Sequence, residues 1–181
     1  MSDTLSPNDL LKEANHAYKK GDYLSAARLF EASAQAFSEE GNEILAAETK
    51  NNACVAYLQI DENEKALSVV ENTTEILEVS KDPIKPAMAW GNLGSALEAN
   101  GRFEEAEIAY AKSAELLREA GEDQLRSNVL QSLSALQLNN GRKLEAWATM
   151  KAGVDGIKRP NIKQRTLKHL LEMPFKFLNK S

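Results

Sequence analysis

Four asparagines recur along the 181-residue chain at intervals near forty residues: Asn15, Asn52, Asn92 and Asn128. An asparagine side chain carries both a hydrogen-bond donor and an acceptor. It can therefore pair with the N–H and C=O groups of an extended peptide whatever that peptide's side chains are, at a net gain of about 0.5 to 1.5 kcal/mol per bond. Amide side chains of this kind suit non-covalent recognition of a peptide backbone.

Residues for catalysis or metal binding are sparse. Cys54 is the single cysteine, and His16 and His169 are the two histidines, so no tetrahedral site of soft ligands can be assembled. Gly91 and Gly94 lack the preceding strand that a phosphate-binding loop needs. We therefore expect no enzyme activity, no metal and no cofactor.

Regular punctuation shows which elements must position the asparagines. Turn-forming residues stand at a fixed interval of forty residues, and each is followed five residues later by an alanine; the two series are Gly21, Asp61, Gly101, Gly141 and Ala26, Ala66, Ala106, Ala146. Such a period in a chain of helix formers predicts one helical hairpin copied four times. Glycine adopts the left-handed conformation that ends a helix, and aspartate tolerates it.

A second set of breakers separates the hairpins, at Gly41-Asn42, Lys81-Asp82-Pro83, Gly121-Glu122 and Pro160-Asn161. They place hairpins near residues 7–40, 43–80, 84–120 and 122–157, with Ser6-Pro7 opening the first helix as cap and first residue. A last helix is expected from Asn161, and Pro174 is expected to end it.

Small residues occupy equivalent positions on the two helices of each hairpin. The first helices carry Ala14, Cys54, Gly94 and Ser134, and the second helices carry the alanines that follow the turns. Helices approach within about 8 Å only where bulk is missing. We expect these positions to face each other, with Phe30, Val70, Tyr110 and Met150 filling the adjoining space.

The third repeat resembles the tetratricopeptide repeat signature. The characteristic residues of this signature occur here in the same order, at Trp90, Leu93-Gly94, Gly101, Ala106 and Tyr110. The first repeat matches the signature at Gly21, Tyr23, Ala26 and Phe30. The resemblance covers residues 8–157. The forty-residue period is similar to the extended branch that includes kinesin light chains and bacterial peptide-sensing regulators. It implies an all-α solenoid of four antiparallel hairpins with a C-terminal capping helix, and one domain over residues 1–181.

In that branch the first helices line a concave groove for peptides, and asparagine ladders bind the peptide backbone. Steps of four, three and four residues along the first helices then give an amide-rich stripe. The candidate partner-binding residues on it are Lys12, Asn15, Lys19, Glu48, Asn52, Met88, Asn92 and Asn128. The resemblance implies a protein or peptide partner. The alternative is that these asparagines simply form a solvated groove wall.

Chaperone-binding members of the family hold a terminal carboxylate with two asparagines and several basic residues. Asn15 and Asn52 match the asparagines, but Leu11, Met88 and Asn92 stand where the basic residues should be. Because a carboxylate must be met by positive charge to leave water, we do not expect this chain to bind chaperone tails.

Charge is divided unevenly along the chain. Residues from Lys151 onward hold eight basic and two acidic side chains, whereas the whole chain has a net charge of -5. The basic tail, residues 158–181, has two interpretations: it caps the array, or its stripe of Leu167, Leu170, Leu171 and Phe175 lies on an anionic membrane surface. The residues after Met173 also allow a weak homodimer.

The composition of the chain also bears on its cellular location and on nucleic acid as a partner. No apolar run approaches the roughly 18 residues of a membrane span, and the first ten residues have no export signal. We expect a cytoplasmic protein. Nucleic acid is not an expected partner, because the residues before Lys151 together carry a net negative charge, which repels phosphate groups.

Overall fold

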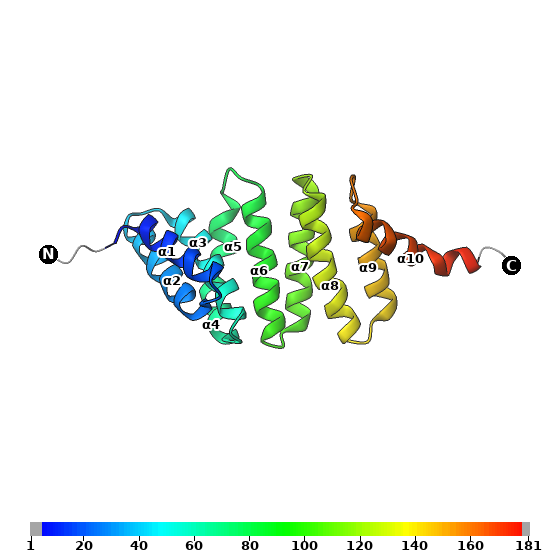
Figure 1. Cartoon of the computed structure of the whole chain (residues 1–181), viewed down its shortest axis with the longest axis horizontal. Helices are drawn as coiled ribbons and strands as arrows, with labels where there is room; N and C mark the ends of the chain where they lie inside the picture. The colour runs from blue at the N-terminus through cyan, green and yellow to red at the C-terminus, as the bar shows by residue number, and fades with distance from the viewer. Residues whose placement is uncertain (1–4, 179–181) are drawn as a thin grey trace. The chain divides into compact units, whose positions relative to one another are not determined.

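The structure, a computed structural model, describes residues 5–178, with side chains through Glu172. Within these residues lie ten helices and no strand (Figure 1). The chain forms two compact units, and the boundary at Ala109 and Tyr110 falls inside α7 (Phe103–Glu119). Each unit is built from antiparallel helical hairpins, as the forty-residue period predicts.

The first unit contains six whole helices. In chain order they are α1 (Pro7–Lys19), α2 (Tyr23–Glu39), α3 (Glu43–Leu58), α4 (Asn63–Val70), α5 (Thr73–Glu78) and α6 (Ile84–Ala99). Ser6 caps α1, because its side-chain oxygen accepts a hydrogen bond from the Asp9 N–H at 3.2 Å. The second unit contains α8 (Asp123–Asn139), α9 (Lys143–Asp155) and α10 (Ile162–Leu178).

The helix ends repeat one left-handed turn. Gly21 has φ +80°, its N–H bonds to the Tyr18 carbonyl at 3.0 Å, and the next N–H, of Asp22, reaches the Ala17 carbonyl at 3.0 Å. This pattern satisfies two carbonyls that the helix end would leave unpaired. Asp61 makes the same turn with φ 57°, which confirms its predicted role as a stand-in for glycine.

The second repeat departs from the predicted pair of unbroken helices. Its second helix is split into α4 and α5 at Glu71 and Asn72. The buried Thr73 hydroxyl donates to the Val70 carbonyl at 3.0 Å. Such a local side-chain bond offers the backbone an alternative to the helical ladder, so the prediction of one helix here is wrong.

The predicted stop at Pro174 is also wrong, since α10 continues to Leu178. Proline removes one backbone donor and disfavours a helix interior. Its fixed φ near −65° is nevertheless a helical value, so α10 can continue as a helix through this residue.

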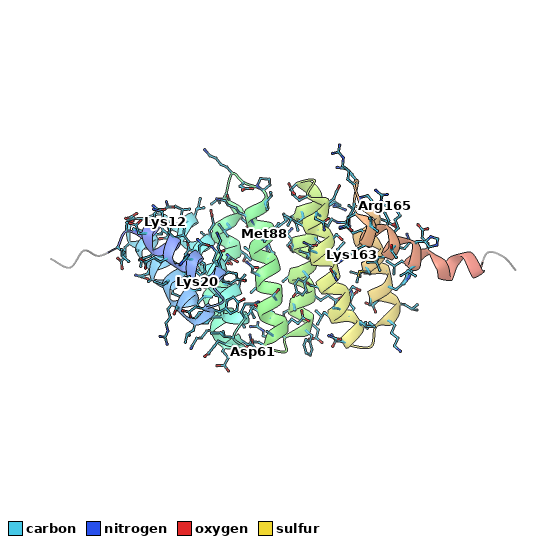
Figure 2. All side chains as sticks on the ribbon, in the orientation of Figure 1. Lys12, Lys20, Asp61, Met88, Lys163 and Arg165 are labelled. Atoms are coloured by element: carbon cyan, nitrogen blue, oxygen red, sulfur yellow. The ribbon has the colours of Figure 1, made fainter. Side chains whose placement is uncertain are left out.

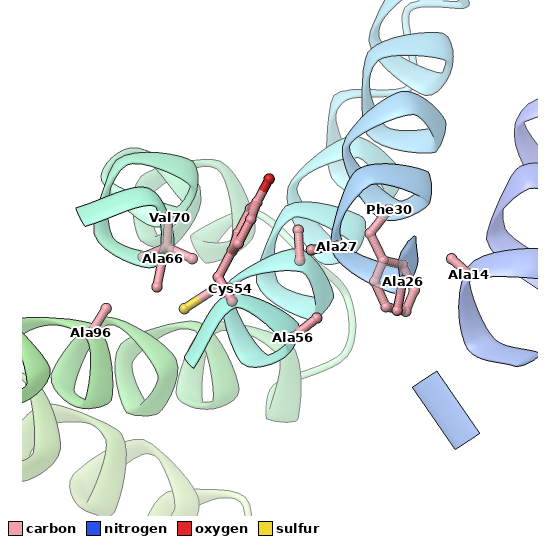
Figure 3. Close-up of a cluster of buried hydrophobic side chains, with 11 residues drawn as sticks. Ala14, Ala26, Ala27, Phe30, Cys54, Ala56, Ala66, Val70 and Ala96 are labelled. Atoms are coloured by element: carbon pink, nitrogen blue, oxygen red, sulfur yellow. The ribbon is translucent and has the colours of Figure 1, made fainter. Parts of the chain in front are cut away.

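The core of the first unit lies where the small residues were predicted. Ala14, Ala26, Cys54 and Ala66 are fully buried in one cluster with Phe30 and Val70 (Figure 3). In the second unit the Ser134 hydroxyl donates to the Ala146 carbonyl at 2.6 Å, which brings α8 and α9 together at the equivalent position. The predicted contact is confirmed in both units.

We predict that Ala106→Leu destabilises the protein by about 1 to 3 kcal/mol, because overpacking a filled core displaces its neighbours. Ala106 is fully buried on α7. The matched control is Ala111→Leu on the same helix, where the side chain is exposed. Thermal and urea unfolding give the measurement, and equal melting temperatures for the two variants would show that the repeat frame is misplaced.

Candidate functional site

The first helices of the hairpins expose the amide-rich stripe. Asn15 on α1 and Asn52 on α3 are exposed, and Asn92 on α6 is half-buried. Another side of the same helices carries the buried Ala14, Cys54 and Gly94. The small-residue core therefore fixes which side of each helix presents its asparagine.

A hollow between α3, α5 and α6 gathers four of the eight predicted residues, namely Glu48, Asn52, Met88 and Asn92. Its volume is about 230 Å³. We call it the amide pocket, and its full lining is Glu48, Asn51, Asn52, Leu77, Ile84, Lys85, Met88, Ala89 and Asn92. Figure 2 labels Met88 on α6, where 44% of the residue is exposed.

Two of the amides in this pocket are held by a chain of hydrogen bonds. The Asn92 Nδ2 donates to Asn51 Oδ1 at 3.1 Å, and the Asn51 Nδ2 donates to the Ala47 carbonyl at 3.0 Å. Asn51 is only 6% exposed. Asn52 makes no side-chain hydrogen bond to any other described residue, so its donor and acceptor are available to a ligand in the pocket.

One rim of the amide pocket is an ion pair between Lys85 Nζ and Glu48 Oε1. About a third of each side chain is exposed, so water and ligands reach both charges. Glu48 Oε2 accepts no hydrogen bond from the described residues. The pair links α3 to α6 directly across the pocket.

The floor of the pocket is apolar. Leu77 of α5, 1% exposed, packs with Ala47 of α3 and Ala89 of α6, and Ile44 and Ile76 flank this small cluster. The pocket thus combines an apolar floor with an amide wall and a charged rim. This combination suits one apolar side chain together with a stretch of polar backbone.

A second hollow of about 180 Å³ lies beside α1, lined by Asn15, Tyr18, Phe30, Asn52 and Val55. Asn52 lines both hollows, and we call the two together the groove of the first unit. The Asn15 Nδ2 donates to the Leu11 carbonyl of its own helix at 2.8 Å. Asn15, Asn52 and Asn92 therefore follow one another along this groove.

The remaining predicted residues lie elsewhere. Lys12 is paired with Asp9 at 3.0 Å, and the Ser6 hydroxyl together with this contact lowers the pKa of the Asp9 carboxyl. Lys12 lines a separate hollow between α1 and α2 that also includes His16. Lys19 is exposed in the last turn of α1.

Asn128 belongs to the second unit, on α8. Its Oδ1 accepts a hydrogen bond from the Gln124 side chain at 3.2 Å. It is exposed.

Sequence reasoning missed Asn51, Lys85 and the floor of the pocket. Lys85 lies three residues before Met88 on α6. Extending the predicted stripe by one more helical turn toward the start of the helix would have included it. Asn51 is adjacent to Asn52 but is buried. Because asparagine is polar, burial at this position was not to be expected from the sequence. Leu77 reaches the pocket from α5, and no local signal announces that contact.

Cys54 lies under the groove and is chemically shielded. Burial raises the pKa of its thiol to about 12, because the thiolate would lose its hydration. The thiol makes a weak hydrogen bond to the Asn92 carbonyl at 3.9 Å. Within residues 5–178 no group of three or more histidine, cysteine, aspartate or glutamate side chains is placed to hold a metal ion.

The C-terminal helix α10 packs on α9, as a capping helix should. Lys168 pairs with Asp155 at 3.2 Å, and the Gln164 amide donates to Gln124 at 2.8 Å. Of the predicted apolar stripe, Leu167 and Leu171 are half-buried and Leu170 is exposed. Phe175 lies outside the residues whose side chains are described.

None of the helices in the described part of the chain is long and apolar enough to cross a bilayer.

The helices and their turns define a tetratricopeptide-like helical repeat protein. A putative kinesin light chain of Podosopora anserina with nearly identical TPR-like repeats superposes with a TM-score of 0.70 at 16% identity, over 84% of this chain and 76% of that one. BtubC (BKLC) from P. vanneervenii gives 0.70 at 19% identity, over 88% and 69%. These likenesses confirm the predicted all-α solenoid class and the kinesin-light-chain type of repeat.

A family model gives a more specific assignment than the fold does. The model of the soluble NSF attachment protein family, SNAP, matches residues 5–168. The chain belongs to this family. Comparison with curated proteins gave no match.

We predict that Cys54 resists thiol reagents at pH 8 in the folded protein and reacts rapidly once the chain is unfolded, because a buried thiol ionises little. Absorbance of the thiol reagent's product against time gives the rate. An Ala111→Cys variant that also carries Cys54→Ala provides an exposed thiol for comparison. Equal rates for the two native proteins would contradict the burial of Cys54.

Proposed function

We propose that the protein is an adaptor that binds an extended segment of another protein in the groove of the first unit. The observation that carries this proposal is the position of Asn52, which lines both hollows between Asn15 on one side and Asn92 on the other. The proposal includes a cytoplasmic location, a single repeat domain over residues 1–181, and a role without catalysis.

The physical support is a division of labour along the groove. The amides of Asn15, Asn52 and Asn92 can pair with a peptide backbone at about 0.5 to 1.5 kcal/mol per bond. The apolar floor at Leu77 and Ala89 adds burial of one ligand side chain, worth about 25 cal/mol for each Å² removed from water. Backbone pairing gives generality, and the floor gives an anchor.

Family membership supports a protein partner. The family is named for attachment to NSF, and kinesin light chains and BtubC share the repeat architecture. Repeat arrays of this kind present extended surfaces for binding. The partner of this chain is proposed by chemistry alone, as a polypeptide with an exposed extended stretch.

The test uses peptides selected from a random display library on the full chain. Replacing two groove amides, Asn52→Ala with Asn92→Ala, is expected to weaken binding of the selected peptides by about tenfold or more, since several backbone bonds are lost. Fluorescence anisotropy gives the affinities. The control pair is Gln131→Ala with Asn140→Ala, which removes two exposed amides from the second unit. Undiminished affinity in the groove variant rules out this binding site.

A second candidate function is contact with an anionic membrane through α10. Ile162 is 80% exposed and Leu170 is 51% exposed, and the exposed Lys163 and the neighbouring Arg165 lie on the same helix (Figure 2). Apolar residues bordered by cations are typical of helices that lie on a membrane surface. The paired Lys168 and the contact with α9 favour the capping role of the same helix.

If this candidate is correct, the full chain sediments with vesicles of phosphatidylcholine and phosphatidylserine. The double variant Ile162→Ser with Leu170→Ser is expected to lose this co-sedimentation. Because both side chains are exposed, the two substitutions are expected to leave α10 packed on α9, so loss of sedimentation would point to the membrane contact and not to loss of the cap. Vesicles of phosphatidylcholine alone measure the electrostatic share. No sedimentation of the unchanged protein on anionic vesicles would remove the candidate.

A further inference from the structure

The charge of the first unit bears on what the amide pocket selects. Residues 1–109 contain 20 acidic and 9 basic side chains, a net charge of -11, whereas residues 110–181 contain 7 acidic and 13 basic ones, a net charge of +6. The pocket lies wholly in the first unit. The net charge of the unit that holds the pocket favours cations over anions as ligands.

The ion pair at the rim gives this preference a specific point of contact. Lys85 occupies Oε1 of Glu48, and Oε2 accepts no hydrogen bond from the described residues. A carboxylate has acceptor positions on both oxygens, so a second cation can bind Glu48 without displacing Lys85. The pair by itself is neutral, and the net charge of the unit therefore decides the sign of the favoured ligand.

The apolar floor specifies the neighbouring ligand residue. Leu77 and Ala89 close the bottom of the pocket, and the half-exposed Met88 borders it with a flexible, polarisable side chain. Methionine adapts its shape to different apolar ligands. A leucine-sized side chain on this floor would place the next ligand residue along the rim formed by Glu48 and Lys85.

We propose that the amide pocket recognises a basic segment, in which an apolar side chain enters the floor and an adjacent arginine or lysine binds the open oxygen of Glu48. This inference rests on the proposed groove function and adds the chemistry of the partner. An acidic segment would have to bring its carboxylate to Lys85 beside Glu48, against the charge of the whole unit. Electrostatic matching of this kind sets specificity more than raw affinity.

The test uses three capped decapeptides that are identical except for the residue beside a central leucine, which is arginine, glutamine or glutamate. Titration of the isotope-labelled full chain follows the side-chain amide signals of Asn52 and Asn92 by NMR. The arginine peptide is expected to bind about fivefold more tightly than the glutamate peptide, the size of one partly exposed charge contact. The preference should shrink as salt is raised, because screening weakens charges at the rim.

Variants of the chain locate the preference. Glu48→Gln is expected to abolish the discrimination between the arginine and glutamine peptides, because the carboxylate that would bind the arginine is gone. Glu64→Gln is the matched control, since it removes the same charge from an exposed position on α4, outside the pocket lining. Circular dichroism confirms that both variants are folded.

Tighter binding of the glutamate peptide, or an unchanged arginine preference in Glu48→Gln, overturns the inference and leaves the groove function standing. Failure of all three peptides to move the two amide signals also overturns it. The groove function is tested separately with the display library, because loss of binding by the asparagine variants there does not depend on ligand charge.

Discussion

The structure depends on the close approach of the two helices in each hairpin, which is possible only because both helices lack bulk at the contact. Ala26 and Ala66 on the second helices are fully buried, as are Ala14 and Cys54 on the first. A tight approach requires a short connection, and the left-handed residue at Gly21 or Asp61 supplies it. Packing between helices and turn chemistry therefore constrain each other in the first two repeats.

The same contact positions the polar site. On α3, Cys54 lies in the core, while Asn51 and Asn52 line the amide pocket three and two residues earlier. The Cys54 thiol reaches the Asn92 carbonyl of α6, and the Asn92 side chain reaches Asn51. The pocket is thus built on helices whose separation is set by the core beneath it, and the amides of Asn51 and Asn92 are held in place without a ligand.

Periodicity made most of the fold predictable. The turns, the small-residue contacts and the accessible stripe all follow from one repeat frame, because each depends on residues close in sequence and repeated in register. The break before Thr73 and the course of α10 beyond Met173 did not follow, since a side-chain hydroxyl and a tolerated proline override the average preference of the segment. Of the site, Glu48, Asn52, Met88 and Asn92 were predictable from helical spacing. Leu77 and the Glu48–Lys85 pair were not, because they arise where separate helices meet.

The break in the second repeat leaves part of the proposed binding surface on a very short helix. The helix α5 has six residues, far fewer than the roughly 12 to 15 that an isolated helix needs to be even marginally stable in water. Its order depends on Leu77, the residue that forms the pocket floor. Local opening of α5 would remove Leu77 from the pocket floor, so a ligand that fills the pocket would slow hydrogen exchange at the α5 amides. Occupancy of the site is thereby coupled to the order of a single short helix.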